Sequence, residues 1–222
     1  MPADQPPREC DVVVVGAGIV GLAVARELAL RHDALRVGVL ERMPGIAAHQ
    51  TSHSSGVIHA GIYYLPGSLK ARLCVAGARE LYAYCDEREI PARRTGKLIV
   101  ATEPTELDRL AELERRGTEN DVPGLRRLGA GELREVEPHV AGIAGLHSPA
   151  TGVVDFARVA AAYADDLGRA GGGVSVDCAV DRISEDGAGA AVQHRHGTTR
   201  ARVAVVCAGA WSDRLAVAAG AP

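Results

Sequence analysis

Aromatic residues are scarce in this 222-residue chain: Phe, Trp and Tyr together make up 3% of it, with a single Trp and a single Phe. A core built from the other apolar residues is therefore aliphatic. The chain also lacks a strong charge of one sign, since its net charge is only −3, and this argues against nucleic acid as a partner. No uninterrupted apolar run approaches the ~18 residues that a membrane-spanning helix needs.

The cysteines lack the spacing of a disulfide framework or a metal site, because their number is odd and no C-x-x-C pair occurs. We expect reduced thiols, a reducing compartment and no metal. Residues 1–9 are polar and proline-rich, without the apolar centre of a signal peptide. The expected location is cytoplasmic, and peripheral contact with the inner membrane stays open. The five cysteines are Cys10, Cys74, Cys85, Cys178 and Cys207.

The first forty residues carry the pattern of a βαβ unit. Residues 11–15 include four consecutive valines, which is typical of a buried parallel strand. The turn GAGIVG follows at 16–21, and an Ala- and Leu-rich stretch predicts a helix over Ile19–Arg31. A second apolar strand, over residues 36–40, ends at the acidic residue Glu41.

In this context G-x-G-x-x-G is the fingerprint of a dinucleotide-binding fold. Gly16 permits the tight turn, Gly18 lets a pyrophosphate approach the backbone, and Gly21 lets the helix pack against the sheet. The helix N-terminus presents N–H groups and the positive end of its dipole to the phosphates. Glu41 would accept hydrogen bonds from ribose hydroxyls and repel the 2′-phosphate of NADP.

The segment 49–64, HQTSHSSGVIHAGIYY, combines three His, three Ser, one Thr and two Gly, without helical or strand periodicity until Val57. Small hydroxyl residues and glycine let the backbone approach a flat or anionic ligand, and histidines move protons near neutral pH. An NAD dehydrogenase normally continues with further βα units at this point, so the segment favours FAD.

Further elements are expected downstream. Apolar residues at helical spacing predict a helix through residues 69–85, with Leu69 and Leu73 on its inner face. Thr105 and Asp108 predict a capping pair for a charged helix. Other helices are expected at 105–118, 130–136 and 155–169 and after Trp211, and strands at 96–102, 174–183, 190–195 and 200–207.

The stretches GAGIVGLAVARELA, VLER and HQTSHSSGVIHAGIYYLPGSLKARLCVAGARELYAYCDE resemble the bacterial L-2-hydroxyglutarate oxidase or dehydrogenase family, within the FAD-dependent, D-amino-acid-oxidase-like superfamily. TGKLIVAT, ELREVEPHVAGIAGLHSPATGVVDF and VVCAGAWSDRLA are similar to it as well. The resemblance implies an α/β fold, with a Rossmann-like FAD-binding domain over 1–85 and 150–222. An α+β piece of the substrate domain would be inserted at 86–149. It also implies that the chain is truncated at its C-terminus, because that family carries a further half.

The resemblance also assigns roles to residues. His59 would take the hydroxyl proton of a 2-hydroxy acid as hydride moves to the flavin, or would pair with the substrate carboxylate as a cation. A purely structural role for His59 stays open. Tyr63 and Tyr64 would line the substrate pocket. The implied FAD ligands are Gly16, Gly18 and Gly21 at the pyrophosphate, Glu41 and Arg42 at the ribose, Thr51, Ser54, Ser55 and Gly56 along the flavin, Val180 at the adenine, and Ala208, Gly209 and Trp211 near the pyrophosphate.

The implied reaction is oxidation of L-2-hydroxyglutarate to 2-oxoglutarate by hydride transfer to FAD, with oxygen or a quinone as electron acceptor. Two alternatives stay open. One is another FAD-dependent oxidase or dehydrogenase of the same superfamily, acting on an amino acid or on glycerol 3-phosphate. The segment 49–64 contains no Arg or Lys for a phosphate, which disfavours glycerol 3-phosphate. The other is a catalytically inactive FAD-binding module.

Overall fold

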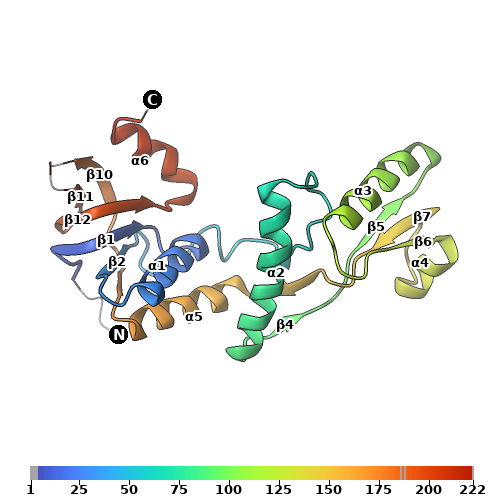
Figure 1. The fold of residues 1–222 in the computed structure, drawn as a ribbon, viewed down its shortest axis with the longest axis horizontal. Helices are drawn as coiled ribbons and strands as arrows, with labels where there is room; N and C mark the ends of the chain where they lie inside the picture. The colour runs from blue at the N-terminus through green and yellow to red at the C-terminus, as the bar shows by residue number, and fades with distance from the viewer. Residues whose placement is uncertain (1–4, 186, 188, 222) are drawn as a thin grey trace. The chain divides into compact units, whose positions relative to one another are not determined.

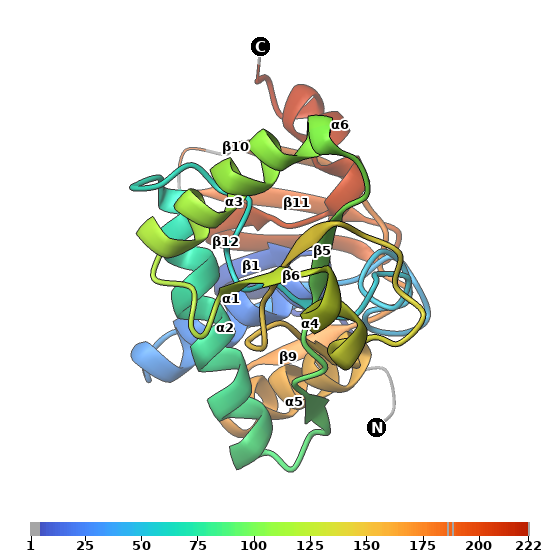
Figure 2. The same ribbon diagram turned by 90° about the vertical axis from the view of Figure 1, so that its right-hand side faces the viewer.

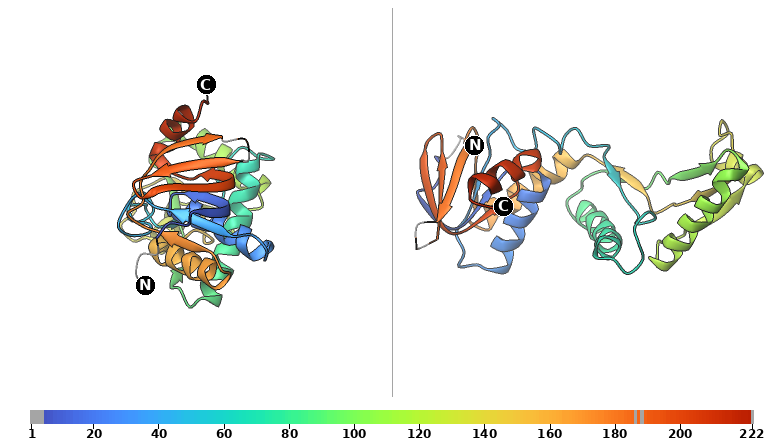
Figure 3. Two further views of the ribbon diagram at one scale, coloured as in Figure 1. Left: turned by 90° about the vertical axis from the view of Figure 1, so that its left-hand side faces the viewer. Right: turned by 90° about the horizontal axis from the view of Figure 1, so that it is seen from above.

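Strand β1 (Glu9–Val15) lies inside a six-stranded sheet in the computed structural model, which describes residues 5–185, 187 and 189–221. It pairs in parallel with β12 (Gly197–Val206) and with β2 (Val37–Leu40). The sheet order is β10-β11-β12-β1-β2-β9 (Figure 1; Figure 3, left). The remaining strands are β9 (Gly173–Ser175), parallel to β2, and the antiparallel β10 (Val180–Glu185) and β11 (Ala190–His194).

The valine run of β1 builds two cores, because successive side chains of a strand point to opposite faces. Val14 belongs to the core formed with helices α1 (Ile19–Arg31) and α5 (Phe156–Arg169), which lie side by side in Figure 1. Val13 belongs to the core on the other face, with β10, β11 and helix α6 (Ser212–Ala218). Both valines have 0% of their surface exposed, and burying each contributes about 1.5–3 kcal/mol.

The main elements predicted for this unit are confirmed. The helix over Ile19–Arg31 has the expected bounds, and α5 confirms the helix expected at 155–169, beginning one residue later at Phe156. A short 3₁₀ turn, η2 (Gly209–Trp211), leads into α6. The strand expected at 174–183 is instead two strands, β9 and β10.

Residues 55–155 form a separate α+β unit, of which Figure 2 shows the helices and several strands. Its two small sheets have the orders β3-β8-β4 and β5-β7-β6, and every pairing in them is antiparallel. No helix in the described part of the chain is both long and apolar enough to cross a membrane. The elements are β3 (Val57–Ile58), α2 (Leu69–Glu87), β4 (Ala92–Arg93), β5 (Leu98–Ala101), η1 (Pro104–Glu106), α3 (Leu107–Glu119), β6 (Arg126–Gly129), α4 (Ala130–Val136), β7 (Ala144–His147) and β8 (Gly152–Val154).

The boundaries of the units differ from the expected division at 85/86 and 149/150. The first unit comprises 1–54 and 156–222, and the second comprises 55–155. Strand β3 pairs with β8, and the Tyr82 hydroxyl of α2 donates to the Ala150 carbonyl at 3.2 Å. These interactions attach α2 and residues 150–155 to the second unit.

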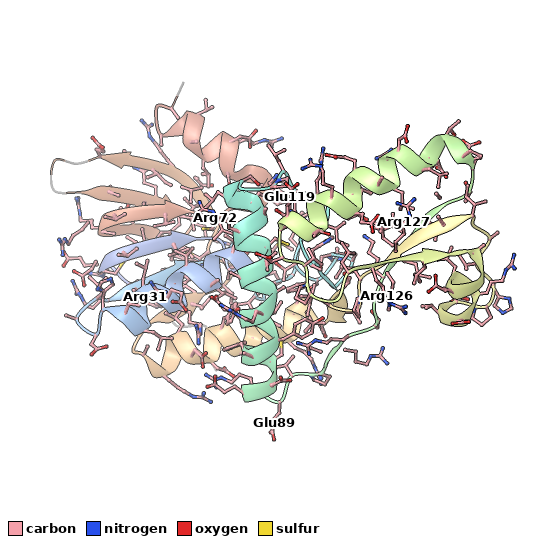
Figure 4. All side chains as sticks on the ribbon, turned by 45° about the vertical axis from the view of Figure 1, so that its right-hand side comes forward. Arg31, Arg72, Glu89, Glu119, Arg126 and Arg127 are labelled. Carbon is pink, nitrogen blue, oxygen red and sulfur yellow. The ribbon has the colours of Figure 1, made fainter. Side chains whose placement is uncertain are left out.

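Two local predictions are wrong. Leu69 and Leu73 of α2 are 61% and 62% exposed, because the helix buries a different stripe that includes Ala71 and Tyr82. Thr105 does not cap α3; the carboxylate of Glu106 instead accepts hydrogen bonds from the Thr102 N–H and hydroxyl. Figure 4 labels charged side chains of the second unit, among them Glu119 of α3 and Arg127 of β6.

Gly16, in the turn between β1 and α1, and Gly21, in α1, lie at positions too closely packed for a side chain. Gly16 has a φ of +106°, and a Cβ built on it would collide with the carbonyl oxygen of Cys207, directly after β12. A Cβ on Gly21 would collide with the carbonyl oxygen of Gly16. Both obstacles are backbone atoms, so no side-chain rotation relieves them.

Gly16→Ala is therefore expected to destabilise the protein by at least about 2 kcal/mol, because it combines an unfavourable φ with a backbone collision. Urea unfolding followed by circular dichroism measures the change. Gly45→Ala is the matched control, since no atom lies within 4 Å of its added Cβ, and it should change stability by less than about 0.5 kcal/mol. Equal stability of the two variants would contradict this account of the turn.

His194 of β11 is a buried histidine in a chain of hydrogen bonds. The His196 N–H donates to its Nδ1 at 3.3 Å, so Nε2 carries the proton and donates to the Thr199 hydroxyl at 3.2 Å. Thr199 donates in turn to the Pro7 carbonyl at 2.6 Å. Burial and then the charge of His196 lower the pKa of His194, while Asp181 opposes them.

Acidification is therefore expected to weaken the fold through His194. Because its pKa is lower in the folded chain than in the unfolded chain, its full contribution to stability is present above pH ~6.5 and is lost as the pH falls through the folded pKa. Urea unfolding between pH 8 and 5 should show a smaller loss for His194→Gln, whose amide offers a donor and an acceptor but does not titrate. Identical pH dependence of both proteins would exclude His194 as the cause.

Candidate functional site

A cavity of about 770 Å³ lies in the first unit, at the carboxyl ends of β1, β2 and β12. This is the edge at which open α/β sheets bind their ligands, and the volume is typical of a small-molecule site. Most of the predicted cofactor ligands line it: Gly16, Gly18, Glu41, Arg42, Thr51, Ser54, Val180, Ala208, Gly209 and Trp211.

Three predicted cofactor residues lie elsewhere. Gly21 is buried under the turn and serves helix packing, as its place in the fingerprint predicts. Ser55 and Gly56 belong to the second unit, where the Gly56 carbonyl accepts a hydrogen bond from the Val154 N–H at 2.9 Å. The segment 49–64 is therefore divided between the two units.

Glu41, directly after β2, connects the strand ends to the glycine turn. Its carboxylate accepts hydrogen bonds from the Ala17 N–H at 2.7 Å and from the Met43 N–H at 2.8 Å, and only 9% of the residue is exposed. A carboxylate has about four acceptor positions, so two remain for other donors. Glu41 can thus hold the turn in place and accept from ligand hydroxyls at the same time.

Thr51 lies at the N-terminus of α1. Its hydroxyl accepts a hydrogen bond from the Ile19 N–H at 3.0 Å and lies 3.3 Å from the position of a Cβ on Gly18. The first turn of a helix leaves N–H groups without partners inside the helix, and these attract anions. Thr51 uses one of these groups, so its hydroxyl lies at the end of the cavity formed by the N-terminus of α1.

Trp211, the single tryptophan of the chain, forms an aromatic wall of the cavity. The Arg42 guanidinium carbon lies 4.5 Å from the indole centre, and the His49 ring approaches it edge-on with centroids 4.7 Å apart. Arg214 also lines the cavity. A cavity that contains a flat ring and two arginines suits a ligand that combines an aromatic base with phosphates.

The second unit contains a small depression of about 10 Å³ where the predicted substrate residues meet. His59, Tyr63 and Tyr64 line it, so the structure brings together all the residues predicted for the substrate. His59 is exposed, and among the described residues no hydrogen-bonding partner of its imidazole is found. Lys97 and Thr151 complete the polar lining, and neither was predicted from the sequence.

Asn120, also not predicted, holds the backbone of this depression. Its buried amide donates to the carbonyls of Gly61 at 3.0 Å and Tyr64 at 2.9 Å, and Arg116 donates to the Tyr63 carbonyl at 3.3 Å. An Asn at the end of α3 indicates a helix cap in the sequence, and it does take the C-cap position. Its hydrogen bonds to carbonyls more than fifty positions earlier in the chain could not be predicted from a local sequence pattern.

Comparisons with known proteins agree with this geometry. Residues 11–222 match the DAO family, described as FAD dependent oxidoreductase. The mitochondrial L-2-hydroxyglutarate dehydrogenase of Homo sapiens is 45% identical over 222 residues, covering 95% of this chain and 48% of that protein. The L-2-hydroxyglutarate dehydrogenase of Indibacter alkaliphilus is 38% identical over 205 residues, covering 92% and 51%. The chain spans about half the length of the curated relatives it matches.

Solved structures show the same fold. L-α-glycerophosphate oxidase from Mycoplasma pneumoniae, with FAD bound, has a TM-score of 0.86 and 27% identity, covering 95% of this chain and 57% of that one. Glycine oxidase from Geobacillus kaustophilus has a TM-score of 0.83 and 28% identity, covering 95% and 58%. The expected fold class and resemblance are confirmed, and the chain belongs to the family of FAD-dependent oxidoreductases.

Proposed function

We propose that this chain is the FAD-binding part of an enzyme that oxidises L-2-hydroxyglutarate to 2-oxoglutarate. The observation that carries the cofactor assignment is the cavity around the glycine turn, which contains most of the ligands predicted from the fingerprint and the resemblance. The substrate assignment rests on relatives of 38–45% identity that are named for L-2-hydroxyglutarate. Because the chain spans about half of those relatives, the activity of the whole protein is part of the proposal.

FAD fits the cavity of the first unit. Gly16, Gly18 and the N-terminus of α1 would hold the diphosphate, and the free acceptor positions of Glu41 would receive ribose hydroxyls. Arg42 and Trp211 would contact the adenosine or the diphosphate. Remaining assignments are Val180 at the adenine, Ala208 and Gly209 near the diphosphate, and Thr51, Ser54, Ser55 and Gly56 along the cofactor. When bound, FAD supplies a two-electron acceptor for hydride.

His59 is proposed to act on the substrate hydroxyl. Oxidation of a secondary alcohol to a ketone removes the hydroxyl proton and a hydride from the same carbon, so the proton needs a base. A neutral imidazole without a competing hydrogen bond can accept it. Tyr63 and Tyr64 line the same depression and offer hydroxyl donors to the substrate. The electron acceptor, oxygen or a quinone, and peripheral membrane contact complete the proposal.

Related substrates are the main alternative. The structural neighbours include an oxidase of L-α-glycerophosphate and one of glycine, so the fold serves phosphates and amino acids as well. The segment 49–64 has no cation of its own, but Lys97 adds one to the depression. A panel of substrates is therefore needed to separate a 2-hydroxy acid from glycerol 3-phosphate and from amino acids.

FAD binding should be visible through Trp211, because a flavin bound in the cavity would quench the fluorescence of the single tryptophan. Titration should give saturable quenching and a yellow protein after desalting. Glu41→Gln replaces a carboxylate that accepts two buried N–H groups, and should weaken FAD binding roughly tenfold or more. Glu80→Gln, an exposed change on α2, is the control and should bind FAD normally. Absence of both quenching and colour would refute FAD binding.

L-2-hydroxyglutarate should bleach the flavin absorbance of an anaerobic, FAD-loaded full-length form faster than glycerol 3-phosphate or amino acids do. His59→Ala should keep the flavin and slow the bleaching about 10²–10⁴-fold, the usual contribution of a catalytic base. His53→Ala is the matched control, because the His53 ring hydrogen-bonds to the His49 carbonyl at 2.7 Å and lines neither the cavity nor the depression. Faster bleaching by another substrate would overturn the substrate assignment, and none with any substrate would indicate a binding module.

A further inference from the structure

Lys97 supplies a positive charge to the depression that contains His59. Its backbone is held firmly, since its N–H donates to the Ser148 carbonyl at 3.1 Å and its carbonyl accepts from the Ser148 N–H at 2.9 Å. Its ammonium lies 4.6 Å from the centre of the Tyr63 ring. This cation–π contact orients the side chain over a residue that is proposed to line the substrate pocket.

The charge of Lys97 is not neutralised by the protein. Among the described residues no carboxylate forms an ion pair with its ammonium, although the side chain is half-buried. Arg116, which donates to the Tyr63 carbonyl, is paired with Glu112 at 2.7 Å. Partial burial of an unpaired ammonium is unfavourable unless an anion can approach it. Lys97 is therefore the cation of this site that is available to an anionic ligand.

We propose that Lys97 binds the carboxylate of the substrate that lies farthest from the reacting hydroxyl, and so selects 2-hydroxy acids with two carboxylates. This inference rests on the proposed function, in which His59 acts on the hydroxyl. Both side chains line one depression, whose volume of about 10 Å³ holds no more than a single water, so a small molecule that engages both would lie across its mouth. A lysine ammonium is a point charge on a flexible stem, which suits the carboxylate at the end of a flexible chain.

The backbone around the depression is held in place by hydrogen bonds. Asn120 and Arg116 of the α3 end hold three carbonyls of residues 61–64, and Ser148 holds Lys97. Tyr63 belongs to this held segment, and its ring lies beside the Lys97 ammonium. Lys70 lies 5.7 Å from the Tyr64 ring but does not line the depression, so it serves as a matched lysine without the proposed role.

Binding is tested first without turnover, with glutarate and with valerate, which has the same number of carbons and one carboxylate. Calorimetric titration of the 222-residue protein should show tighter binding of glutarate. Lys97→Met should weaken glutarate binding roughly ten- to hundredfold, the effect of losing one charge-assisted hydrogen bond, and leave valerate unchanged. Lys70→Met should change neither ligand. Equal wild-type affinity for glutarate and valerate, or an equal loss of both in Lys97→Met, would overturn the proposal.

Kinetics of a full-length form give the second readout. Lys97→Met should lower kcat/KM for L-2-hydroxyglutarate roughly ten- to hundredfold, mainly through KM, and change it less than about threefold for L-2-hydroxyvalerate. An equal fall for both substrates would assign Lys97 to the shared carboxylate or to folding, and would refute the selection of dicarboxylates. Failure of the proposed function is recognised separately, because the wild-type protein would then leave L-2-hydroxyglutarate unoxidised.

Discussion

The arrangement of the cavity depends on the close approach of three strand ends around the glycine turn. Gly16 directly follows β1, and its N–H donates to the carbonyl of Leu40 at the end of β2, at 2.8 Å. Cys207 directly follows β12, and its N–H donates to the carbonyl of Val15 at the end of β1, also at 2.8 Å. The Glu41 carboxylate binds the Ala17 N–H from the end of β2. Because backbone atoms of Cys207 and Ala208 surround Gly16, that position leaves no room for a side chain. The same packing keeps the N-terminus of α1 at the edge of the sheet, where a diphosphate can reach it.

Two distant parts of the chain must meet to form this cavity. Residues 5–54 supply the glycine turn and Glu41, and residues 156–221 supply Trp211 and the neighbouring backbone. Helices α1 and α5 join the two parts through Arg26 and Asp166, whose Nε and Oδ2 atoms are 2.7 Å apart, with Asp166 only 3% exposed. Removing one partner of such a buried pair is costly, because it leaves the other charge without that partner.

Much of the first unit could be predicted because its signals are local. Four valines before G-x-G-x-x-G specify a buried strand, a tight turn and a helix within about twenty residues. The second unit was less predictable. Helix α2 carries two apolar stripes, and periodicity alone did not show that Ala71 rather than Leu69 is buried. The unit boundaries depend on the pairing of β3 with β8, two strands of two and three residues.

The sequence by itself determined the cofactor class, the βαβ unit and the grouping of His59, Tyr63 and Tyr64, because each of these rests on residues close together in the chain. Only the tertiary structure showed that Lys97 lines the same depression and that Asn120 holds its backbone. The physical reason is that β5 and the end of α3 reach it through long-range backbone pairing and side-chain hydrogen bonds. Such contacts join residues whose separation along the chain has no fixed period, so no local sequence pattern predicts them.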